Sequence, residues 1–76
     1  MKEDFARELQ RLRIKHFFTQ REFARRLHID KSTYNAWEKN KRFPLPQSMK
    51  AVADFYAAMG EDITKLLELY RNNKEG

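Results

Sequence analysis

Apolar residues recur at intervals of three and four positions along most of the chain, which is the spacing of an amphipathic helix. The pattern predicts a first helix over residues 3–15, followed by two short helices over 20–27 and 31–39. Each helix would then turn one face toward a shared core. The apolar stripes are Phe5, Leu9 and Leu12 in the first helix, Phe23, Ala24 and Leu27 in the second, and Tyr34 and Trp37 in the third.

Two more helices are predicted in the second half of the chain. One covers residues 47–59 and ends at Gly60, and the other begins near Asp62, whose carboxylate can cap it. The polar residues from about 72 to 76 are expected to form a disordered tail. With only two glycines, two prolines and scattered β-branched residues, helices are favoured nearly everywhere. The predicted fold class is all-α, a compact five-helix bundle.

The two short helices are separated by only a few residues, and both have capping residues at their starts. Thr19 precedes the second helix, and Glu22 stands three residues later, which is the capping-box arrangement. Asp30 precedes the third helix, where its carboxylate suits the free N–H groups and the positive end of the helix dipole. The pattern therefore predicts two helices joined by a tight turn.

The length of 76 residues supports one small domain, assigned to residues 1–76, with a single core. The chain has no cysteine, so its stability must come from packing rather than from disulfides or thiolate metal sites. No apolar run approaches the roughly 20 residues that cross a bilayer. The protein is expected to be soluble and cytoplasmic, without a membrane partner, a metal or another cofactor.

The net charge of +5 is unevenly distributed. Residues 7–42 contain eleven Lys or Arg and four acidic residues, whereas the rest of the chain carries a net charge of −2. Such a surplus indicates a positive face turned toward a polyanion, most commonly a nucleic acid. A solvated surface that keeps the domain soluble explains the charge equally well.

Residues 9–44 resemble the helix-turn-helix of the Cro and lambda-repressor type, also called the XRE family. Apolar, small and capping residues fall at the family's spacing across more than thirty positions of this segment. The matching residues are Leu12, Arg13, Phe18, Thr19, Gln20, Phe23, Ala24, Ile29, Tyr34, Trp37, Glu38 and Pro44.

This resemblance implies that the segment 31–39 is a recognition helix that enters the major groove of double-stranded DNA. It also implies a structural ion pair between Arg13 and Glu38, and structural roles for Ala24 and Trp37. The residues that it places at the bases are Lys31, Ser32 and Ala36, with Asn35 nearby, and those that it places at phosphates are Gln20, Thr33, Lys39, Lys41 and Arg42. Lys31, Lys41 and Arg42 also have a simpler interpretation as ordinary solvated charge.

The sequence departs from the family pattern at three glycine positions. His28 and Asn40 stand where the backbone is expected to have a positive φ, which both residue types tolerate at a modest cost. Phe17 occupies the third such position, either packed beside Phe18 or partly exposed.

The resulting hypothesis is a transcriptional regulator, more specifically a repressor, that binds a palindromic operator. Excess apolar surface on the fourth and fifth helices suggests a homodimer interface, although a central place for the fourth helix would also explain it. The alternative function is a protein-interaction module, such as an antitoxin or an adaptor of another regulator. It would depend on Phe55, Met59 and Leu69. An enzyme is not expected, because the sequence offers no nucleophile, base and orienting set.

Overall fold

The computed structural model describes the backbone of residues 2–75 and the side chains of residues 4–72. The helices are α1 (Lys2–Lys15), α2 (Gln20–Leu27), α3 (Lys31–Glu38), α4 (Pro46–Ala58) and α5 (Thr64–Glu75). No strand occurs in the part of the chain that is described. The prediction of an all-α fold with five helices is therefore confirmed, and each helix begins within two residues of its expected start.

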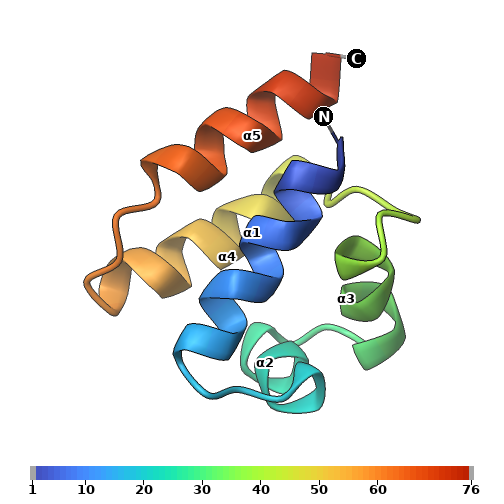
Figure 1. The fold of residues 1–76 in the computed structure, drawn as a ribbon. Helices are drawn as coiled ribbons and strands as arrows, with labels where there is room; N and C mark the ends of the chain where they lie inside the picture. Colours follow the sequence, from blue (N-terminus) through green and yellow to red (C-terminus); the bar gives the residue numbers. More distant parts are fainter. Residues whose placement is uncertain (1, 76) are drawn as a thin grey trace.

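Helix α1 runs through the middle of the molecule and contacts both ends of it (Figure 1). It packs against α3 on one side and against α5 on the other, while α2 packs against α3 and α4. In the view of Figure 1, α2 lies at the bottom and α5 at the top. The helix-turn-helix is thus held at one end of the molecule, away from α5.

The core is dominated by aromatic rings, and each of the five helices contributes at least one. The Phe23 ring lies 5.2 Å from the rings of both Tyr34 and Tyr56, and 5.3 Å from that of Phe55. Aromatic pairs at this distance stabilise a core beyond the area that they bury. The buried cluster comprises Phe5, Leu9, Leu12, Phe23, Ala24, Tyr34, Trp37, Met49, Val52, Tyr56, Leu66 and Tyr70.

Three helix ends differ from the prediction, and one of them is that of α4, which ends at Ala58 rather than at residue 59. Helix α3 ends at Glu38, with Lys39 as its C-cap, one residue earlier than expected. Helix α5 continues to Glu75, so residues 72–75 of the expected disordered tail are helical, while Gly76 lies outside the described residues. Polar residues extend a helix readily once its first turns are packed, because adding each further residue costs much less than nucleation.

Within the described backbone, three non-glycine residues adopt a positive φ: Phe17 at 63°, His28 at 58° and Asn40 at 59°. The expectation for His28 and Asn40 is confirmed. Phe17 shares this conformation, and 92% of its surface is exposed, so it does not pack into the core beside Phe18. Gly60, with a φ of 85°, follows α4 as predicted.

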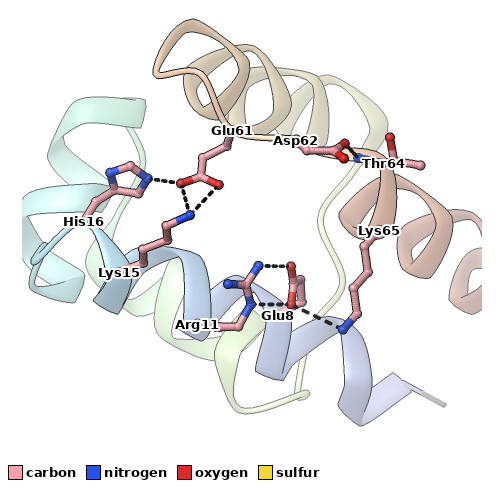
Figure 2. Close-up of polar contacts among 8 residues, drawn as sticks. All are labelled: Glu8, Arg11, Lys15, His16, Glu61, Asp62, Thr64 and Lys65. Atoms are coloured by element: carbon pink, nitrogen blue, oxygen red, sulfur yellow. Dashed lines mark hydrogen bonds and ion pairs between the residues drawn. The ribbon is translucent and has the colours of Figure 1, made fainter.

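Polar contacts tie α1 to the α4–α5 turn and to α5 (Figure 2). The Glu61 carboxylate accepts hydrogen bonds from Lys15 and contacts His16 Nε2 at 2.7 Å. The buried Glu8 accepts two hydrogen bonds from the Arg11 guanidinium, at 2.9 and 2.7 Å, and Lys65 lies 4.0 Å away. Asp62 Oδ1 accepts a hydrogen bond from the backbone N–H of Thr64, the first residue of α5.

Candidate nucleic-acid interface

The tight turn between α2 and α3 is built from backbone hydrogen bonds. His28, in the left-handed conformation, donates its N–H to Arg25, and Ile29 donates its own to Ala24. Ala24 is 1% exposed where α2 packs on α3, so a larger side chain there would force the helices apart. The turn therefore fixes the angle between α2 and α3.

The start of α2 has the predicted capping box. Thr19 Oγ1 accepts a hydrogen bond from the Glu22 N–H at 3.0 Å, and Glu22 Oε1 accepts one from the Thr19 N–H at 2.8 Å. At the start of α3, Asp30 occupies the N-cap position, but its side chain makes no capping hydrogen bond. Asp30 thus lies at the predicted N-cap position but does not form the expected hydrogen bond.

The ion pair expected between Arg13 and Glu38 is present. Arg13 Nε donates to Glu38 Oε2 at 2.7 Å, and Nη2 donates to Oε1 at 3.0 Å, a bidentate geometry. Nη1 of the same guanidinium donates to the Phe18 carbonyl at 2.8 Å, next to the start of α2. The side chains of Arg13 and Glu38 are 11% and 3% exposed. One buried cation therefore connects α1, α3 and the segment that leads into α2.

Gln20 and Asn35 extend this polar cluster toward the outer face of α3. Gln20 Nε2 donates to Glu38 Oε1 at 3.0 Å, and Asn35 Nδ2 donates to Gln20 Oε1 at 2.8 Å. The family resemblance placed Gln20 among the phosphate contacts and Asn35 near the base contacts, and the hydrogen bond between them was not predicted. Both side chains are half-buried.

The cluster keeps Glu38 ionised. Burial alone would raise the pKa of the Glu38 carboxyl, but hydrogen bonds from Arg13 and Gln20 outweigh burial and hold that pKa below its usual value. Tyr34 lies in the same buried region, where desolvation and the Glu38 carboxylate raise the pKa of its hydroxyl. Glu38 is therefore an acceptor and Tyr34 a neutral phenol at physiological pH.

The outer face of α3 presents short or flexible side chains. Lys31 and Ser32 are exposed, while Thr33, Asn35 and Ala36 are half-buried. None of these makes an ion pair with a neighbouring acidic residue in the described part of the chain. Lys31 and Ser32, at the start of α3, are therefore accessible to another molecule.

The basic residues after α3 are held beside its last turn. The backbone N–H groups of Lys41 and Arg42 donate to the Ala36 carbonyl at 2.9 and 3.3 Å, and both residues are exposed, as is Lys39. Arg7 of α1 lines a shallow hollow with Lys39 and Asn40, so it adds a cation to this edge. Sequence reasoning counted Arg7 only as part of the charge surplus.

Among the side chains that the structure describes, no group of three or more His, Cys, Asp or Glu is placed to hold a metal ion. None of the described helices is long and apolar enough to span a bilayer.

Comparison with known proteins gives two matches to a helix-turn-helix. Residues 6–73 match the family described as a helix-turn-helix domain. The chain is also 28% identical over 71 residues to the HTH-type transcriptional activator BcrR of Enterococcus faecalis, an alignment that covers 86% of this chain and 35% of that protein. The chain thus spans about a third of the length of this relative. No solved structure matches significantly.

Proposed function

This chain belongs to the helix-turn-helix domain family, and we propose that it regulates transcription by binding double-stranded DNA with α3 in the major groove. The observation that carries this proposal is the contrast between the two sides of α3. Its inner side is fixed by the Arg13–Glu38 pair, whereas its outer side exposes side chains that have no ionic partner. A rigid helix with a free outer face is what reading base edges requires.

The proposed contacts divide into two groups. Lys31, Ser32 and Ala36 contact base edges, where a lysine donates to guanine and a methyl group meets a thymine methyl. Asn35 lies on the same helix with its amide already bound to Gln20. Phosphates are contacted by Gln20, Thr33, Lys39, Lys41 and Arg42, and these contacts position the domain without reading the sequence.

We propose a palindromic operator and a homodimer because one α3 contacts too few bases to be selective alone. Two copies related by a two-fold axis would place their recognition helices about 34 Å apart. A shallow groove between α4 and α5 offers an apolar surface for the second copy. Pro46, Met49, Lys50, Ala53, Leu67, Tyr70 and Arg71 line it.

We propose that the protein represses transcription rather than activating it. Occupying promoter DNA needs only the binding surface, whereas activation needs an additional contact with the transcription machinery. The relative from Enterococcus faecalis is named an activator, and that name describes a protein of which this chain covers 35%. A promoter reporter that registers both increase and decrease distinguishes the two signs.

The experiment that tests DNA binding is selection from a random duplex library at about physiological salt. Enrichment of an inverted repeat would support the dimeric regulator, and enrichment of a single half-site would support binding by a monomer. If the protein retained every duplex equally and in a salt-dependent way, sequence-specific regulation would be wrong.

The alternative function, a protein-interaction module, predicts a different pattern of sensitivity. Of the residues on which it depends, Phe55 and Leu69 are half-buried against the core and Met59 is 41% exposed. Met59→Ala would then abolish partner binding, whereas Lys31→Ala and Ser32→Ala would leave it unchanged. The DNA hypothesis predicts altered base preference for the two α3 variants and none for Met59→Ala.

A further inference from the structure

The hydrogen-bond cluster between α2 and α3 fixes the direction of each side-chain amide in it. The Glu38 carboxylate is ionised and has only acceptor oxygens. Its neighbour Gln20 must therefore turn the Nε2 end of the amide toward Glu38, as the 3.0 Å contact shows. The carbonyl end of Gln20 then points away from Glu38.

Asn35 provides the donor that the carbonyl end of Gln20 requires. Because Gln20 presents Oε1 to α3, the partner on α3 must be a donor, and Asn35 supplies Nδ2 at 2.8 Å. Arg13, Glu38, Gln20 and Asn35 therefore form one directional series of hydrogen bonds that begins in α1 and ends on α3. An amide has two N–H groups, so Gln20 keeps one Nε2–H that Glu38 does not use.

We propose that Asn35 is a positioning residue that acts on DNA through Gln20, rather than a residue that reads a base. This inference rests on the proposed function, in which Gln20 donates to a phosphate. Asn35 holds Oε1 of Gln20, and Glu38 holds the first Nε2–H, so the second Nε2–H is fixed in direction before DNA arrives. A fixed donor loses less side-chain entropy on binding than a mobile glutamine does.

This role makes a distinctive prediction for affinity. A base-reading residue, when removed, changes which base is preferred at one position, whereas a residue that orients a phosphate donor lowers affinity for all sequences alike. Removing Asn35 should also have no effect when Gln20 is already absent. Ser32 makes no hydrogen bond to Gln20, so any loss of affinity from Ser32→Ala should be the same with and without Gln20, which provides a matched control for the coupling.

The test is a double-mutant cycle on DNA affinity with Gln20→Ala and Asn35→Ala. The probe is the duplex that the unsubstituted chain enriches from a random library, together with its single-base variants. Alanine is a better helix former than asparagine, so α3 should remain folded, which circular dichroism checks. We expect Asn35→Ala to weaken binding about five-fold in the original chain and less than about two-fold in the Gln20→Ala background.

The outcomes separate the inference from the proposed function. A changed preference at one base pair would make Asn35 a reader and overturn the inference. The inference would also be overturned if Asn35→Ala weakened binding equally in the original chain and in the Gln20→Ala variant, or in neither. Sequence-specific binding by the original chain would stand in both cases. If the original chain selected no duplex at all, the proposed function would fail, and the inference with it.

Discussion

At the scale of single residues, Phe17 stands out because its backbone conformation is unfavourable for a bulky side chain. The residue has a φ of 63° and exposes 92% of its surface, so it combines a disfavoured conformation with an unburied ring. Bulky side chains are rare in this region because Cβ approaches the carbonyl oxygen. His28 and Asn40 share the conformation, but asparagine and histidine tolerate it better. The left-handed turn at Phe17 lets the Phe18 N–H donate to the Arg13 carbonyl at the end of α1, so this position needs the conformation but not the exposed ring.

Phe17→Gly should stabilise the protein. Glycine removes the steric cost of the left-handed conformation, about 1 kcal/mol, and no packing is lost. For a domain of this size, about 1 kcal/mol raises Tm by roughly 4–8 °C, which thermal unfolding measures. Asn40→Gly is the matched control and should change Tm less. A fall in Tm for Phe17→Gly would mean that the exposed ring makes a contact worth more than the strain.

The ion pairs of this chain differ in burial, and therefore in how much each contributes to the free energy of unfolding. Glu38→Gln leaves the Arg13 guanidinium, 11% exposed, without its charged partner. Breaking such a buried pair costs about 3–5 kcal/mol. Asp54→Asn breaks the Lys50–Asp54 pair of α4, whose side chains are 76% and 65% exposed, and should hardly change the free energy of unfolding, because solvent screens an exposed pair. Denaturant unfolding of both variants measures the difference, and equal losses would contradict a buried bridge.

At the scale of elements, sequence patterns located the helices better than they located individual side-chain contacts. Spacing of apolar residues determines which face is buried, and this local rule placed all five helices. The contact between Asn35 and Gln20 depends on side-chain directions that are decided only after α2 and α3 pack. The same limit explains Asp30, because position alone does not determine whether a carboxylate turns toward the helix N–H groups.

The two N-caps provide a prediction at this scale. Thr19→Ala removes a side chain that accepts a capping hydrogen bond and should cost about 1 kcal/mol of unfolding free energy. Asp30→Ala removes a residue at the equivalent position of α3 that makes no such bond, so only a few tenths of a kcal/mol from the helix dipole should be lost. Chemical denaturation of both variants measures this. Equal costs would show that Asp30 forms a cap in solution.

At the scale of the whole molecule, the pairing of exposed cations differs between the two ends: several near α3 make no ion pair, whereas several near α5 do. Among the described residues, the exposed cations near α3 that make no ion pair include Arg7, Lys31, Lys39, Lys41 and Arg42. Toward α5, in contrast, Lys15, Arg11 and Lys65 contact the carboxylates of Glu61 and Glu8 (Figure 2). The charge surplus of residues 7–42 indicated a polyanion partner, but only the structure separates the paired cations from the unpaired ones. The unpaired set lies around the proposed DNA surface.

This distribution predicts which lysines and arginines control the salt dependence of DNA binding. Each phosphate neutralised in B-DNA adds about 0.9 to the slope of log affinity against log salt. Lys41→Ala and Arg42→Ala should each reduce that slope by about 0.9 and weaken binding to every duplex alike, because phosphate contacts carry no sequence information. Lys65→Ala is the control, since Lys65 lies on α5 beside Glu8 and outside the proposed DNA surface, and it should leave the slope unchanged. Titrations of one fluorescent duplex at several salt concentrations measure the slopes. An unchanged slope for Lys41→Ala and Arg42→Ala would show that this loop does not face the phosphates, and the orientation proposed for α3 in the groove would then be wrong.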